Sequence, residues 1–144
     1  MSRKDPNIRL RVPKAQKPVY DALVGSCFEK LADVFILALS IGVKWHLLCK
    51  LERPEPLCRS SNLDDCWACL YVAALIHEGC SIEELGDDEK VRDVAERFAC
   101  GGMSRLIEDL RNDNVIALKD GNYDVVSGSE PLAVAVARHI LNYG

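Results

Sequence analysis

Residues 30–43 read KLADVFILALSIGV, and this stretch decides the fold because it is apolar around most of a helical circumference. A helix of this kind lies at the centre of a core or in an interface, whereas a surface helix keeps one polar face. Gly42 is expected to mark its end. One short neighbour cannot cover so much apolar surface, so the sequence predicts a homodimer with Phe35 at the two-fold interface.

Residues 7–12, which precede this helix, alternate between apolar and basic side chains. Alternation with a period of two predicts a half-buried strand. Its apolar face is formed by Ile8, Leu10 and Val12, and its basic face by Arg9 and Arg11. Pro13 is expected to end the strand, and Pro18 suits the first turn of a helix over residues 19–29.

The order of basic strand, helix and apolar helix over residues 7–43 is that of a ribbon-helix-helix module, in which paired strands enter the DNA major groove. The alternative is an edge strand whose exposed face happens to be basic, and the prolines at 13 and 18 count against a regular module. In the DNA-binding interpretation, basic side chains contact bases and phosphates while apolar ones form the dimer core. The DNA-binding candidates are Arg9, Arg11, Arg3 and Lys4, and the interface candidates are Ile8, Leu10, Val12 and Phe35.

The rest of the chain predicts a loop over residues 53–62 and then a helical part, residues 64–144, with a late hairpin. Residues 45–51 fit either a continued helix or a strand. The expected helices cover residues 64–77, a short segment opened by Ser81 and Glu84, residues 88–100, 103–111 and 132–141. Gly101-Gly102 is expected to separate two of them, and Asp120-Gly121 between short apolar runs predicts the hairpin. The predicted fold is a mainly α, helix-rich α+β single domain over residues 1–144.

Seven cysteines are an odd number, which fits a closed disulfide framework poorly. No stretch resembles a signal peptide or a membrane span, so we expect a cytoplasmic protein, no membrane contact and mostly reduced thiols. Cys66 and Cys69 form a CxxC pattern. Because the pattern stands alone, it is a weak signal for redox chemistry, and we expect both cysteines to pack in the core. A zinc site would need further ligands such as Cys58, Cys80 or His77, at a spacing that matches no standard finger.

Charge and motif content favour a protein that works by binding. The formal net charge is -4, the first twenty residues are basic, and residues 83–113 are strongly acidic. The basic end could meet phosphate, which the acidic stretch would repel. The three histidines form no metal or catalytic pattern, and neither a nucleophile elbow nor a phosphate-binding glycine loop occurs. We therefore expect no enzymatic activity and no cofactor.

Three stretches of the chain resemble a family of small bacterial proteins associated with the Dnd DNA-phosphorothioation systems. They read DVFILALSIG at residues 33–42, LYVAAL at 70–75 and VRDVAERFACGGM at 91–103. The likeness covers roughly residues 8–110. The cysteine-rich middle, the FACGG form of the third stretch, and the C-terminal hairpin and helix depart from the family pattern.

The resemblance implies a non-enzymatic accessory role in DNA modification or phage defence, through duplex DNA, through other subunits of a modification or restriction system, or both. It supplies no catalytic residues. The alternatives are a ribbon-helix-helix transcriptional regulator and a protein-interaction subunit without DNA contact. Salt-dependent, sequence-specific DNA binding separates these alternatives.

Overall fold

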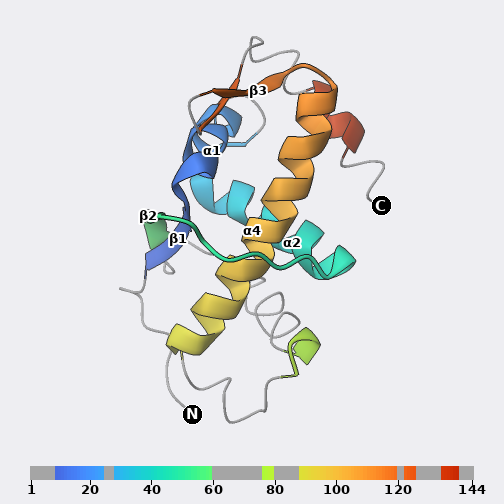
Figure 1. Cartoon of the computed structure of the whole chain (residues 1–144). Helices are drawn as coiled ribbons and strands as arrows, with labels where there is room; N and C mark the ends of the chain where they lie inside the picture. The colour runs from blue at the N-terminus through green and yellow to red at the C-terminus, as the bar shows by residue number, and fades with distance from the viewer. Residues whose placement is uncertain are drawn as a thin grey trace.

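The computed structural model describes residues 9–24, 28–59, 76–79, 88–119, 122–125 and 134–139. Its elements follow the order β1 (Arg9–Pro13), η1 (Lys14–Gln16), α1 (Lys17–Leu23), α2 (Leu31–Trp45), β2 (Pro54–Arg59), α4 (Asp88–Asn112), β3 (Ile116–Lys119) and β4 (Asn122–Val125), and residues 134–139 are helical. Figure 1 shows α4 as a long diagonal with α2 beside it, the β1–β2 pair near its middle and β3 near its end. The fold is helix-rich α+β, as the sequence predicts.

Glycines bring α2 and α4 together at their crossing. A Cβ atom added at Gly42 would lie 1.9 Å from the carbonyl oxygen of Phe98, and one added at Gly102 would lie 1.8 Å from that of Ala38. Only hydrogen on the α-carbon allows two helix backbones to approach so closely. The pair of long helices that organises the core therefore depends on these two positions.

The same contacts explain why the helix boundaries predicted at glycines are wrong. Gly101-Gly102 does not separate two helices, because α4 runs unbroken through both. Glycine lowers helix propensity by about 1 kcal/mol relative to alanine, and here the tertiary contact overrides that preference. Gly42 likewise lies inside α2, which ends at Trp45 with His46 in the left-handed conformation (φ 51°).

Strand β1 finds its partner within the same chain. It pairs antiparallel with β2, with Leu10 opposite Cys58 and Arg11 opposite Pro56. Residues 53–62 were predicted to be a loop because of Pro54 and Pro56, and for the strand residues this prediction is wrong. Pro54 begins the strand, and Pro56 faces a residue whose N–H points away from β2, so neither proline removes a required donor.

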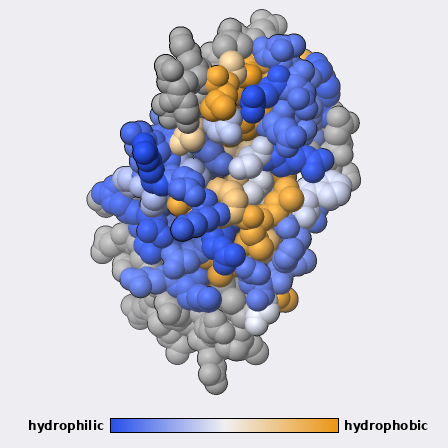
Figure 2. Space-filling view, in the orientation of Figure 1, coloured by the Kyte–Doolittle hydropathy of each residue, from blue (hydrophilic) through white to orange (hydrophobic). Residues whose placement is uncertain are grey.

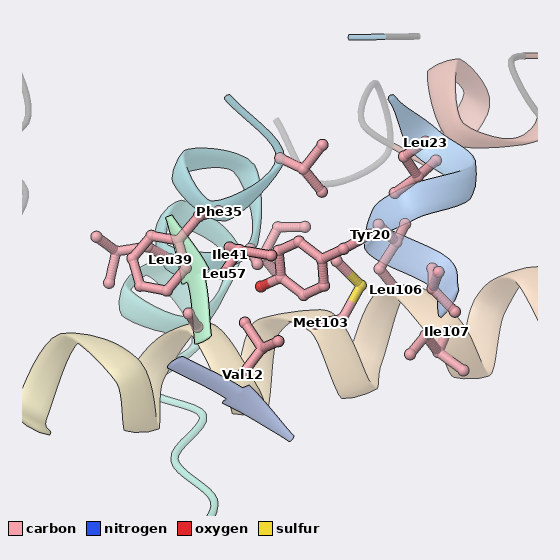
Figure 3. Close-up of a cluster of buried hydrophobic side chains, with 14 of the residues drawn as sticks. Val12, Tyr20, Leu23, Phe35, Leu39, Ile41, Leu57, Met103, Leu106 and Ile107 are labelled. Atoms are coloured by element: carbon pink, nitrogen blue, oxygen red, sulfur yellow. The ribbon is translucent and has the colours of Figure 1, made fainter. Parts of the chain in front are cut away.

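The core is completed by side chains from all the long elements (Figure 3). Buried positions on α4 recur every three or four residues, as on an amphipathic helix, and they include Phe98, Leu106 and Leu110. Tyr20 of α1 lies fully buried at the centre, among residues of α2, α4 and the two strands. Most of the apolar surface of α2 is thus covered within one chain.

The C-terminal half confirms the predicted hairpin. β3 and β4 pair antiparallel with Lys119 opposite Asn122, so the connection is the two residues Asp120-Gly121. The helical residues 134–139 fall inside the predicted 132–141 helix, and His139 Nε2 lies 2.8 Å from Asp113 Oδ2 at the end of α4. Gly79, two residues beyond the predicted 64–77 helix, has a φ of 74°. Most of the predicted 64–77 helix and the Ser81–Glu84 pattern lie outside the described residues.

Helix α1 is shorter than the sequence predicts. It ends at Leu23, where Val24 turns to an extended conformation and bridges to Phe28. None of the helices in the described residues is both long and apolar enough to cross a membrane.

Candidate functional site: a charged pocket beside an irregular segment

The residues between α2 and β2, numbers 46–53, form an irregular segment that crosses α4 (Figure 1); we call it the crossing segment. It begins at a helix cap in which the Leu47 N–H donates to the Gly42 carbonyl oxygen at 2.8 Å. Midway, the Cys49 N–H donates to the Arg97 carbonyl oxygen of α4 at 3.2 Å. The sequence left residues 45–51 open between a continued helix and a strand; Trp45 continues α2, and residues 46–51 form neither.

A disulfide joins Cys49 of the crossing segment to Cys100 of α4, with the two Cα atoms 5.6 Å apart. The expectation that the cysteines are mostly reduced is corrected for this pair. An odd total is compatible with one bridge, and residues 51 positions apart in sequence give no signal that they meet in space. Cys58 is a free, half-buried thiol.

Next to the crossing segment lies an open pocket of about 340 Å³. Its lining comes from four parts of the chain: Arg11 of β1; Asp93, Glu96 and Arg97 of α4; Lys50 and Leu51 of the crossing segment; and Pro54 of β2. Figure 2 shows this face as blue surface around an orange centre, where the crossing segment passes over α4. The pocket therefore combines charged side chains with a small apolar wall.

Glu96 is the buried charge of this pocket, with only 1% of its side chain exposed. Arg11 Nη2 lies 2.8 Å from Glu96 Oε1, Arg11 Nε lies 3.2 Å from both carboxylate oxygens, and the Arg11 backbone N–H donates to Oε2. Arg92 Nε adds a longer contact at 3.9 Å. Burial raises the pKa of Glu96 above its ordinary value despite these arginines, whose charges act in the opposite direction.

Asp93 completes the cluster on the solvent side. Its Oδ1 lies 3.1 Å from Arg11 Nη2 and 3.3 Å from Arg92 Nη2. Hydrogen bonding to Glu96 raises the pKa of Arg11, so this guanidinium stays charged. The two carboxylates and two arginines thus balance one another.

Lys50 and Arg97 are the remaining cations of the pocket. Lys50 is exposed, and Arg97 lies 3.3 Å from Glu78. Lys50 therefore adds a cation to a lining of mixed charge, and Glu89 adds a negative charge that acts on Arg11. At the other end of the crossing segment, Trp45 is 45% exposed, with Lys44 Nζ at 5.6 Å and Arg105 Cζ at 5.7 Å from its ring centroid.

The predicted DNA-binding and interface residues occupy different environments. Arg9 is exposed at the start of β1, while Arg11 is engaged in the ion pairs described above. Leu10, Val12 and Phe35 were predicted to seal a dimer, but all three are buried in the core of a single chain. A second copy is not needed to bury them, because β2 of the same chain pairs with β1 where a strand of the second copy was expected. Arg3, Lys4 and Ile8 lie outside the described residues.

Of the candidate zinc ligands, Cys58 and His77 lie in the described residues. Within the described parts of the chain, no three His, Cys, Asp or Glu residues are grouped to hold a metal ion. Burial raises the pKa of the Cys58 thiol to about 11, which opposes the thiolate needed by a ligand or nucleophile. Cys66, Cys69 and Cys80 lie outside the described residues.

Sequence reasoning missed Glu96, Asp93 and the Cys49–Cys100 pair. Residues 88–100 were predicted to form a helix, and nothing in the local pattern marks Glu96 as buried. Its partner Arg11 lies 85 positions away.

Comparison with protein-family models, with curated protein sequences and with solved structures found no match to this chain.

Proposed function

We propose that the protein is a non-enzymatic accessory subunit of a bacterial DNA-modification or phage-defence system, and that it acts by binding a partner protein. The setting follows from the resemblance at residues 33–42, 70–75 and 91–103. We place the partner contact along the crossing segment, with Trp45 just before its first residue and the charged pocket beside its last residues.

Trp45 is the single observation that carries this proposal. A tryptophan 45% exposed and flanked by two cations is unusual on a surface that serves no contact, because aromatic residues and arginine are enriched where proteins bind one another. The pocket at the other end of the crossing segment supplies a recess of mixed charge that includes the exposed cation Lys50 and the apolar residues Leu51 and Pro54. Together they suit a partner segment with an apolar side chain and a carboxylate.

Purified proteins encoded beside this chain's gene provide the test. Titration calorimetry should detect binding by at least one of them, and the double variant Trp45→Ala/Lys50→Glu should bind at least tenfold more weakly, which corresponds to about 1.4 kcal/mol. Lys30→Glu is the matched control, since it reverses an exposed charge at the opposite end of α2. No binding by any of these proteins, or equal binding by the double variant, would refute the proposal.

Contact with duplex DNA is the second candidate, and the exposed position of Arg9 is the observation that favours it. Its weakness is that Arg11 is committed to Glu96 and Asp93. Titration of duplex DNA at two salt concentrations distinguishes this candidate, because a phosphate contact weakens as salt rises. Loss of affinity in Arg9→Ala would favour it, and salt-independent or undetectable binding would exclude it.

A further inference from the structure

The crossing segment is fastened to α4 at its middle and tied to neighbouring elements at both ends. At the middle are the Cys49–Cys100 disulfide and the Cys49 N–H to Arg97 carbonyl hydrogen bond. At one end Leu47 caps α2 through the Gly42 carbonyl, and at the other the Lys14 N–H donates to the carbonyl oxygens of Glu52 and Arg53. Opening the disulfide would therefore remove the covalent attachment at the middle of the segment and leave the Cys49–Arg97 hydrogen bond there, while the two ends stay attached.

The core of the molecule does not rest on this disulfide. The α2–α4 crossing is made by close backbone contact at Gly42 and Gly102 and by fully buried side chains such as Phe98. Cys100 is only 3% exposed, and its sulfur is bonded to Cys49 of the crossing segment. The bridge thus links an irregular surface segment to a core that is packed independently.

The two sulfur atoms differ in how far solvent reaches them. Cys100 is only 3% exposed, whereas Cys49 is intermediate. Cys49 is followed by the exposed Lys50, and its N–H binds the backbone of Arg97. Thiol–disulfide exchange depends on access to the sulfur, so we expect the exchange to begin at the more exposed Cys49.

The pocket depends on the placement of this segment. Lys50 and Leu51 follow Cys49 directly and form one wall, while Asp93, Glu96 and Arg97 of α4 form the opposite wall. The disulfide and the Cys49–Arg97 hydrogen bond fix the distance between these walls. A change at Cys49 would therefore act directly on the shape of the pocket.

We propose that Cys49 and Cys100 form a reversible thiol–disulfide latch, which closes by exchange with a glutathione-type disulfide and fixes the pocket for its partner. The consequence for partner binding rests on the proposed function. The latch itself does not, because it concerns only the crossing segment and α4.

The exchange balances as follows. The Cys49 thiolate attacks the glutathione disulfide, forming a mixed disulfide and releasing one glutathione thiolate. The Cys100 thiolate then attacks Cys49 Sγ, forming the protein disulfide and releasing the second glutathione. Two electrons pass from the protein thiols to glutathione, and the two thiol protons end on the two glutathione molecules formed. Excess reduced glutathione drives the same steps in reverse.

The test uses the full chain equilibrated in glutathione buffers from fully reduced to fully oxidised. Differential alkylation with mass spectrometry should show Cys49 and Cys100 becoming protected together, while labelling of Cys58 stays unchanged. Hydrogen exchange at residues 47–51 should be at least tenfold faster in the reduced protein, with α4 residues 103–107 changed by less than twofold. Cys49→Ser should behave like the reduced protein in all buffers, and Cys58→Ser like the wild type.

Four outcomes would overturn the latch. Cys49 and Cys100 could label as free thiols even in excess oxidised glutathione, or resist labelling in excess reduced glutathione. Exchange in α4 could accelerate together with the crossing segment, which would make the bridge a staple of the whole fold. Finally, a partner found by the calorimetric test could bind the oxidised and reduced forms equally. Failure to find any partner leaves the first three measurements decisive and counts only against the proposed function.

Discussion

At the scale of single residues, Arg11 and Arg9 share a predicted strand face yet have different roles. We expect Arg11→Ala to lower the free energy of unfolding by about 2–4 kcal/mol, because it leaves the buried carboxylate of Glu96 without its main partner. Arg9→Ala should change it by less than about 0.5 kcal/mol, as exposed substitutions do. Urea unfolding of both variants measures this, and equal effects would contradict the assigned ion pair.

Glu96 should also make stability depend on pH. Because burial raises its pKa in the folded protein, the folded state holds this proton more tightly than the unfolded chain, where the pKa is about 4.3. The contribution of Glu96 to stability therefore falls as pH rises from that value through the raised folded pKa. We expect Glu96→Gln to gain stability relative to wild type as pH rises from 4 toward 7. Urea unfolding measures the difference in stability between Glu96→Gln and wild type at each pH. If that difference stays constant, or if Glu96→Gln loses stability relative to wild type as pH rises, Arg11 has a larger effect than burial on the pKa of Glu96.

Among the residues that the structure describes, the fully buried hydroxyl of Tyr20 has no hydrogen-bond partner. Figure 3 shows it at the centre of the apolar cluster, and burial raises its pKa, so the phenol stays protonated. An unpaired buried hydroxyl costs about 1–3 kcal/mol. We expect Tyr20→Phe to raise the free energy of unfolding by about 1 kcal/mol, with a higher melting temperature in thermal unfolding. A destabilised variant would indicate that the hydroxyl is paired.

At the scale of elements, the α2–α4 crossing is decided by glycine. Alanine at Gly102 would favour an isolated helix by about 1 kcal/mol, but its Cβ would lie 1.8 Å from the Ala38 carbonyl oxygen, which belongs to a backbone that cannot yield locally. We expect Gly102→Ala to destabilise the protein by about 3 kcal/mol or more, at the upper end of overpacking effects. Glu108→Ala, on the exposed side of α4, is the control for denaturant unfolding and should stay within about 0.5 kcal/mol. Equal stability of the two variants would mean that the helices can separate without cost.

At the scale of the whole molecule, the fold closes its own core. Leu10, Val12 and Phe35 are buried without a second copy, and β1 already pairs with β2. The argument for a dimer from the apolar surface of α2 therefore loses its physical basis. We expect a melting temperature that does not change with protein concentration, whereas an obligate dimer is stabilised as concentration rises. Thermal unfolding over a hundredfold range of concentration, with light scattering at both ends, checks this expectation.

The sequence by itself determined the elements whose signals are local. Alternation marked β1, the apolar run marked α2, and Asp120-Gly121 marked the turn between β3 and β4. Each of these signals lies in the same few residues that form the element, so it can be interpreted without knowing which distant segment the element contacts. They were enough to predict a helix-rich α+β fold with an N-terminal strand and a C-terminal hairpin.

Only the tertiary structure decided what those elements contact. Gly101 and Gly102 look like a helix end in isolation, yet they permit the approach of another backbone. Pro54 looks like loop, yet it begins a strand because β1 offers a place where its missing N–H is not needed. Arg11 meets Glu96, and Cys49 meets Cys100, across 85 and 51 positions of sequence. Such pairings depend on how helices and strands pack in space, and no local periodicity in the sequence indicates which distant residues will meet.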